Sequence, residues 1–170
     1  RKLNIDDLAF IIGPIINSAG RMKNANEVVK LLTSNNTTTQ KKIINNIFNL
    51  NQKRKNLEHK ILSHLNFKEL SKNDGVIFIY EDIIPEGIVG IVASRVKEYF
   101  NKPCIVLTKR GDIYKGSARS TSMFNIGQYI NTAIQKKILI SGGGHNLAAG
   151  ICLHKNNIHL FKHYLNAIYK

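Results

Sequence analysis

Three consecutive glycines and a histidine form the segment of the sequence with the clearest chemical potential. Gly142, Gly143 and Gly144 precede His145, and the small residues Ala148 to Gly150 follow. Glycine lets a backbone approach a ligand closely and turn its N–H groups toward an anion, and a histidine can donate to a phosphate oxygen or approach a metal. A plain turn between two strands has the same composition. The segment favours a phosphate-binding loop, with the plain turn as the alternative.

A second polar cluster lies earlier in the chain. Ser117, Arg119 and Ser120 follow the strand-like pair Ile113-Tyr114. The planar guanidinium group of arginine suits phosphate, and neighbouring hydroxyls complete a set of donors. Serines in such a turn also cap helices and turns, which is the structural alternative. Together the two segments favour recognition of a phosphodiester by two loops.

The composition is that of a globular and strongly basic chain. Its 170 residues are 43% hydrophobic and include 3 prolines, which favours a folded core over disorder. The formal net charge of +14 is spread along the chain rather than gathered in a tail. Such a charge favours a polyanionic partner, nucleic acid above all, through counterion release. Coding bias is the alternative, because Lys, Asn and Ile are all abundant and all are favoured by AT-rich codons.

The cysteines and the apolar runs indicate a compartment. Cys104 and Cys152 lie in apolar, strand-like runs without Cys-x-x-Cys spacing, so we expect small core residues in a reducing environment. No apolar stretch approaches the roughly 20 residues of a membrane span. We therefore expect a cytoplasmic protein with no membrane partner. The start at Arg1 suggests a piece of a longer chain.

The first part of the chain predicts helices. The apolar segment from Ile5 to Ile16 is expected to break at Gly13-Pro14 and to close in the small, polar run from Asn17 to Arg21. Asn24 to Leu32 has a helical pattern, so that short helices would surround a loop.

A long helix is predicted next. Thr37 and Gln40 resemble a capping box, and one helical stripe of apolar residues runs from Thr38 to Leu65, on the order of 40 Å. Its basic face consists of Lys41, Lys42, Lys53, Arg54, Lys55 and Lys60. Two interpretations of this face stay open: exposure to solvent, and contact with a nucleic-acid backbone.

Strands and helices alternate after a polar break near Asp74. The predicted strands are Val76–Tyr80, Cys104–Leu107, Ile113–Gly116, Ile138–Ile140 and Ala149–Leu153, and the predicted helices are Gly87–Phe100, Asn125–Ile134 and Ile158–Tyr169. This alternation predicts an α/β fold.

Carboxylates are scarce where the phosphate-binding segments lie. No Asp or Glu follows Asp112, and the earlier ones are scattered, so no set of Asp and His ligands for a catalytic metal is visible. We expect no metal ligand in this chain and no hydrolysis by this chain alone.

The order of four motifs resembles the RecJ-type single-stranded-DNA exonucleases of the DHH phosphoesterase superfamily. Ile12–Met22 resembles the Gly-Pro-Arg-Ile-Asn-Ala-Ala-Gly-Arg-Leu signature of that family. The later motifs match Gly87–Arg95, Gly116–Ser120 and Gly143–His145, in the same order. The resemblance spans nearly the whole chain.

The resemblance implies an arrangement of domains. Residues 1–36 would end the DHH-type catalytic domain, residues 37–70 would form a long connecting helix, and residues 74–170 would form the DHH-associated α/β domain with a mixed sheet. An N-terminal domain outside this chain would bind Mn²⁺ or Mg²⁺. The implied activity is 5′-to-3′ exonucleolytic hydrolysis of single-stranded DNA in DNA repair and recombination. This segment would clamp the strand, and single-strand-binding protein is an implied partner.

The same resemblance implies roles for single residues. His145, with Gly143 and Gly144, would contact the phosphate at the catalytic centre. Arg119, with Ser117 and Ser120, would bind a neighbouring phosphate. On the side of the first domain, the substrate-binding residues would be Asn17 and Arg21. A cap for Asn17 and a surface ion pair for Arg21 are the structural alternatives.

Two departures from the family pattern remove expected substrate contacts. Ile84-Pro85-Glu86-Gly87 stands where Trp-His is common, and Ile15 replaces the arginine that usually follows Gly-Pro. Two other classes stay open: an oligoribonuclease or phosphoadenosine phosphate phosphatase of the same superfamily, and a non-catalytic nucleic-acid-binding module.

Overall fold

The computed structural model describes residues 2–169 and divides the chain into two compact units, residues 1–60 and residues 61–170. None of the helices in this described range is both long and apolar enough to cross a membrane. Each unit has its own packing and is described by itself.

A continuous helical segment opens the first unit. The π-helix η1 (Asp7–Ile12) runs directly into α1 (Gly13–Met22). Asn4 and Asp7 cap its start reciprocally, because each backbone N–H donates to the other side chain, at 3.1 and 2.8 Å. The predicted break at Gly13-Pro14 is wrong. Pro14 lies in the first turn of α1, where its fixed φ is compatible with a helix.

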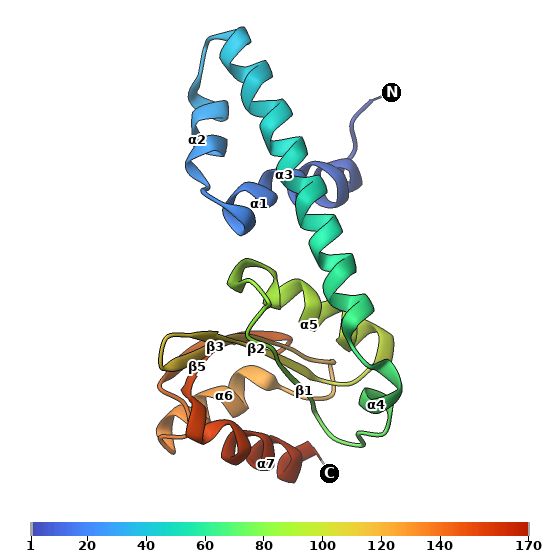
Figure 1. Cartoon of the computed structure of the whole chain (residues 1–170), viewed down its shortest axis with the longest axis vertical. Coiled ribbons are helices and arrows are strands. Elements are labelled where there is room, and N and C mark those ends of the chain that lie inside the picture. Colours follow the sequence, from blue (N-terminus) through green and yellow to red (C-terminus); the bar gives the residue numbers. More distant parts are fainter. Residues whose placement is uncertain (1, 170) are drawn as a thin grey trace. The chain divides into compact units, whose positions relative to one another are not determined.

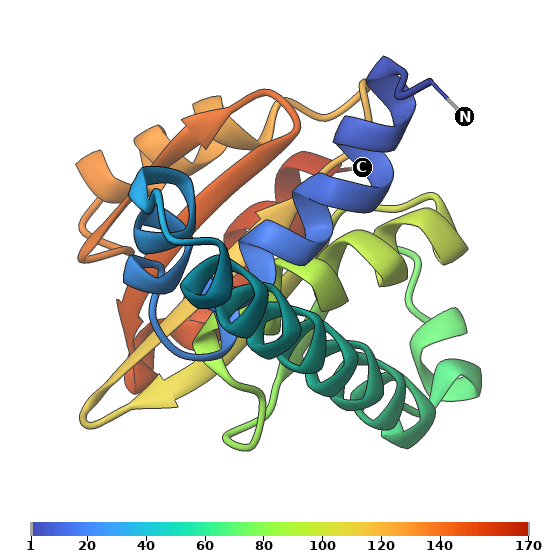
Figure 2. The same ribbon diagram turned by 90° about the horizontal axis from the view of Figure 1, so that it is seen from above.

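The first unit is completed by α2 (Asn26–Thr33) and α3 (Thr37–His64), which begins in this unit. Ala19, Val28, Ile43 and Ile47 form a small core among α1, α2 and α3. The single long helix predicted from the apolar stripe is confirmed, and Figure 2 shows it unbroken.

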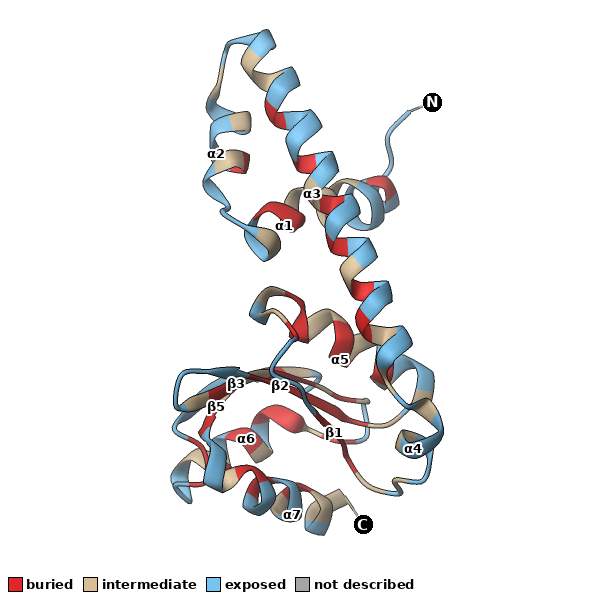
Figure 3. Cartoon of the chain, viewed as in Figure 1, coloured by how far each residue is buried: buried red, intermediate tan, exposed pale blue. Residues whose placement is uncertain are grey.

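Two details of α3 differ from the expectation. The Oδ1 atom of Asn36, and not Thr37, caps the helix by accepting the N–H of Thr39 at 2.9 Å. Arg54 was expected on the exposed basic face, but it is buried, with Nη1 2.6 Å from Oε2 of Glu58 and Nε 3.1 Å from Oδ1 of Asn51. These three polar residues continue the buried side of α3 that Figure 3 shows in red.

The second unit is built on a five-stranded mixed sheet in the order β1-β2-β3-β5-β4. Its strands are β1 (Ile77–Tyr80), β2 (Cys104–Arg110), β3 (Ile113–Arg119), β4 (Ser141–His145) and β5 (Ala148–His154). β1 and β2 are parallel, and the other pairs are antiparallel. The predicted α/β class with a mixed sheet is confirmed.

The two faces of this sheet are covered differently. Its helices are α4 (Phe67–Ser71), α5 (Glu86–Phe100), α6 (Ile126–Gln135) and α7 (Ile158–Tyr169), with a short 3-10 turn η2 (Lys155–Asn157) before α7. Figure 1 shows α5 on one face and α6 and α7 on the other. The predicted bounds of α7 are confirmed at both ends, and those of α5 and α6 within one residue.

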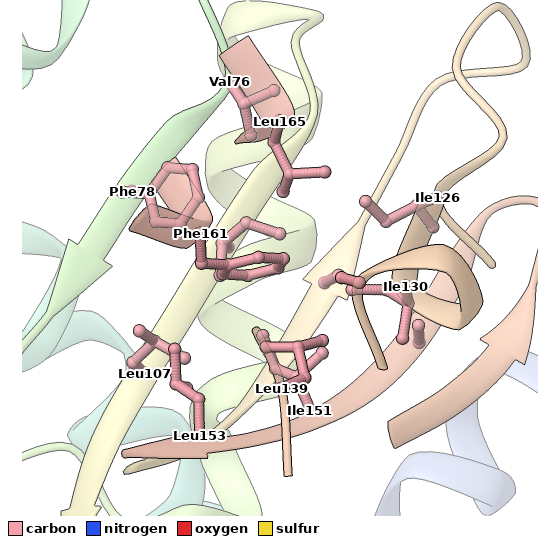
Figure 4. Packing of buried hydrophobic residues seen from close by; sticks show 14 of the residues in the cluster. Val76, Phe78, Leu107, Ile126, Ile130, Leu139, Ile151, Leu153, Phe161 and Leu165 are labelled. Carbon is pink, nitrogen blue, oxygen red and sulfur yellow. The ribbon is translucent and has the colours of Figure 1, made fainter. Parts of the chain in front are cut away.

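The main core lies between the sheet and the pair α6 and α7. Alternate residues of β2, β3 and β5 point into it, together with Phe78 of β1, and the rings of Phe78 and Phe161 meet edge to face, with centroids 5.6 Å apart. Figure 4 shows these rings among Leu107, Leu153 and Leu165. Burying this apolar surface holds the sheet in place.

Candidate phosphate-binding face

Strand pairing brings the two polar motifs of the sequence onto one face of the sheet. Arg119 of β3 pairs with Ala148 of β5, which pairs with His145 of β4. In the adjacent row, Ser117 pairs with Gly150, which pairs with Gly143. Residues two apart on a strand share a face, so both rows lie on the face opposite the main core.

The motifs lie on strands, which corrects the prediction of two loops. β3 extends through Arg119, so Ser117 and Arg119 are strand residues, while Ser120 follows the strand. The glycine segment is β4 itself, and Ile138–Ile140, predicted as a strand, is a bend before it. Pairing with β5 makes a strand of residues whose own propensity for strands is low.

This face is open beyond β3. α5 packs on β2 and β3, whereas all five residues of β4 are exposed. A side chain built on Gly150 would meet nothing within 4 Å. A ligand can therefore lie directly on the backbone of β4 and β5.

Gly144 serves a structural purpose on the other side of β4. A Cβ atom there would overlap the carbonyl oxygen of Ala148 and lie 2.5 Å from the Cα atom of Ala149. Glycine at this position is required by the close approach of β4 to β5. A direct contact of Gly144 with substrate remains a prediction.

Arg119 is held in place by contacts on its own strand and on α5. Its Nη1 atom donates to the Oγ atom of Ser117 at 2.6 Å and to the carbonyl oxygen of Ala118 at 2.8 Å. Its Nη2 atom lies 2.9 Å from the position that a Cβ atom of Gly90 would occupy. The absence of a side chain at Gly90 gives the guanidinium group room beside α5.

The two serines have internal partners. The Oγ atom of Ser117 also contacts the carbonyl oxygen of Ala149 at 3.5 Å, so that this hydroxyl links Arg119 to β5. Ser120 is 3% exposed, and its hydroxyl donates to the carbonyl oxygen of Phe124 at 2.6 Å. The structure thus gives Ser120 an inward-pointing side chain, whereas Ser117 orients the arginine.

His145 stands at the end of a fixed hairpin. Asn146 and Leu147 form the two-residue turn between β4 and β5. The carbonyl oxygens of these two residues accept the N–H groups of Ile126 and Ser120, at 3.1 and 2.9 Å. The imidazole ring is exposed, and its Nδ1 atom faces the N–H of Leu147 at 3.4 Å. The backbone is therefore anchored while the ring is accessible.

The remaining two predicted site residues belong to the other unit. Asn17 and Arg21 lie four residues apart on α1, on one exposed side of the helix. The neighbouring Ser18 points inward, where its hydroxyl donates to the carbonyl oxygen of Ile15 at 2.5 Å. The expected loop around Asn17 is thus a helix.

No metal centre is formed by the residues described. Nowhere in residues 2–169 do three or more His, Cys, Asp or Glu side chains gather where they could hold a metal ion. The residues around His145 are glycine, alanine and amide side chains, which are not a ligand set for a divalent cation.

Sequence reasoning missed three residues that shape this face. Gly150 and Cys152 of β5, with Lys115 of β3, share it with the predicted residues. The alternation of small and apolar residues from Ala148 to Leu153 was the available signal.

The two cysteines differ in burial. Burial raises the pKa of the Cys104 thiol well above its usual range, whereas Cys152 is half-buried.

The fold and this face define a class of protein. The DHHA1 domain family matches residues 73–170, more than half of the chain, and the chain belongs to this family. Over nearly its whole length the chain is also homologous to the single-stranded-DNA-specific exonucleases called RecJ, which confirms the resemblance drawn from the motifs.

The RecJ relatives are longer than this chain. RecJ of Escherichia coli is 33% identical over 175 residues, covering 95% of this chain and 30% of that protein. RecJ of Haemophilus influenzae is 32% identical over 172 residues, covering 94% of this chain and 29% of that protein. The chain therefore spans less than a third of the length of these relatives.

A solved structure has the same fold. The crystal structure of RecJ from Thermus thermophilus in complex with Mn²⁺ matches with a TM-score of 0.82 and 26% identity, over 96% of this chain and 24% of that one. A structure of the same protein with Mg²⁺ gives a TM-score of 0.81. The metal ions belong to those complexes, and RecJ is a nuclease at the level of the family.

Proposed function

We propose that this chain is the strand-binding part of a RecJ-like, single-stranded-DNA-specific 5′-to-3′ exonuclease, with phosphates held on the face of β3, β5 and β4 that lies opposite the main core. The observation that carries the proposal is the strand register, which puts the half-buried Arg119 and the exposed His145 in one row of this face. An arginine and a histidine with only the methyl group of Ala148 between them form a site for an extended polyanion.

The two side chains contact successive phosphates in this proposal. Arg119 and His145 are two strand spacings apart, about 10 Å across the sheet. Arg119 donates to one phosphate with its guanidinium group, oriented by Ser117. His145 donates to the next phosphate, with Gly143 and Gly144 letting the strand approach. Ser120 supports the turn before α6 without a direct contact.

The rest of the full-length protein supplies the hydrolytic chemistry. Mn²⁺ or Mg²⁺ would be bound by the part of the catalytic domain that lies outside this chain. Residues 1–36 would form the end of that domain, and Asn17 and Arg21 would be among its substrate-binding residues. Such a protein acts in the cytoplasm on single-stranded DNA during repair and recombination, with single-strand-binding protein as a partner. The names of the RecJ relatives support single-stranded DNA as the substrate, and the Mn²⁺ and Mg²⁺ complexes support the metals.

The test is binding of the chain to a fluorescent single-stranded oligonucleotide over a salt series. We expect His145→Ala and Arg119→Ala each to weaken binding by about 1–2 kcal/mol, roughly 5- to 30-fold. Two control variants remove comparable groups elsewhere: His163→Ala on α7, and Arg110→Ala at the end of β2. Controls that weaken binding as much as the site variants would show that only diffuse charge attracts the strand.

A further inference from the structure

A groove of about 500 Å³ lies beside His145, between α6 and the end of β4. It is separate from the open sheet face, because α6 packs on the opposite side of the sheet. His145 and Asn146 form one wall, and the other wall is the exposed side of α6 with Gln128, Asn131 and Gln135.

Gly127 sets the width of this groove. A Cβ atom on Gly127 would lie 2.9 Å from the backbone C and O atoms of His145. The first turn of α6 can therefore touch the end of β4 only because this residue is glycine. The Asn125 side chain caps the helix by accepting the N–H of Gln128 at 3.2 Å, so the wall begins at a fixed point.

The groove is lined by amides that have no partner within the described range. Among residues 2–169, no hydrogen bond engages the side chains of Gln128, Asn131, Gln135 or Asn146. Each amide carries both donors and an acceptor. An amide row of this kind can bind a flat, polar group through two hydrogen bonds at a time.

The lining is also uncharged. The residues around the groove include no Lys, Arg, Asp or Glu, although the chain carries a net charge of +14. A phosphate would meet no lysine or arginine side chain here. The groove therefore suits a neutral polar ligand adjoining a phosphate, and a nucleobase has that chemistry.

We infer that this groove binds the base of the nucleotide whose phosphate lies at His145. The inference rests on the proposed function and adds a base site to the phosphate sites. Amide side chains contact the edge of the base, which has to be unpaired to expose its hydrogen-bonding groups. Because amides can match any base edge, the site contributes affinity with weak sequence preference and selects single strands over duplexes.

The test measures binding of a series of short oligothymidylates, each of which lacks the base at one successive position. The series is measured with the parent chain and with the double variant Gln128→Ala/Asn131→Ala. In the parent, we expect loss of the base at one or two positions to weaken binding about 5-fold. In the double variant, the same omission should have no further effect, because the partners of that base are gone. Alanine is a better helix former than either residue, so the variant keeps its fold.

Asn45→Ala, an exposed amide of α3, is the control and should retain the response of the parent. The base site is overturned if no abasic position weakens binding to the parent. It is also overturned if the missing base weakens binding to the double variant as much as it weakens binding to the parent. In both of these cases the weakening by Arg119→Ala would persist, so the proposed function survives. If the parent fails to bind oligonucleotide at all, both proposals are overturned.

Discussion

The Nη1 atom of Arg119 donates to two oxygens on its own strand, the Oγ atom of Ser117 at 2.6 Å and the carbonyl oxygen of Ala118 at 2.8 Å. The Ser117 hydroxyl is itself 3.5 Å from the carbonyl oxygen of Ala149. A flexible side chain fixed at this point loses less entropy when it binds phosphate. Ser117 therefore acts through Arg119 and is a positioning residue.

We expect Ser117→Ala to weaken binding of single-stranded oligonucleotide by about 1 kcal/mol in the parent, because the guanidinium group loses one of its fixed partners. In the Arg119→Ala background the same substitution should have almost no effect. Anisotropy titrations of the four proteins of this double-mutant cycle measure the coupling. Ser122→Ala, an exposed serine after β3, is the control. Equal effects of Ser117→Ala in both backgrounds would instead assign the serine its own contact with the strand.

At the scale of elements, the sequence was most informative where periodicity was strong. α7 and the long α3 follow apolar stripes that only a helix can bury on one side. β4 could not be found this way, because Gly142 to Gly144 have no side chains to alternate and a low propensity for strands. Its conformation comes from pairing with β5, a contact that is set by the tertiary fold.

Alanine substitutions at two glycines of the β4–β5 pair should affect different properties, one the stability of the fold and the other the binding of oligonucleotide. Gly144→Ala forces a methyl group onto the backbone of Ala148 and Ala149, and we expect a loss of about 1–3 kcal/mol in the free energy of unfolding. Gly150→Ala has room for its methyl group and should unfold at nearly the parent temperature. That methyl group projects from the open face, so oligonucleotide binding should weaken several-fold.

Thermal unfolding and anisotropy on the same two variants make the comparison. The proposed face would be excluded as the binding surface if Gly150→Ala bound the oligonucleotide as tightly as the parent. The packing account of Gly144 would fail if Gly144→Ala were as stable as the parent.

At the scale of the molecule, the candidate residues divide between the two units. Asn17 and Arg21 lie on α1 in residues 1–60, whereas Ser117, Arg119 and His145 lie in residues 61–170. The residue types of the phosphate site could be predicted from the sequence, because arginine, histidine and glycine carry recognisable chemistry. Their placement in one row could not, since it depends on the order β3-β5-β4, in which β4 lies outside β5. The amide groove was missed for the same reason.

The chain by itself should bind single-stranded DNA without hydrolysing it. Hydrolysis of a phosphodiester by this class of enzyme needs a metal ion to generate the attacking hydroxide, and residues 2–169 contain no group of three or more ligands for one. Binding through Arg119 and His145 needs no metal, so we expect the same affinity in EDTA and in Mn²⁺. Anisotropy in both buffers and release of labelled mononucleotides over hours measure the two properties. A binding loss in EDTA, or mononucleotide release that His145→Ala abolishes, would mean that this chain assembles a metal centre of its own.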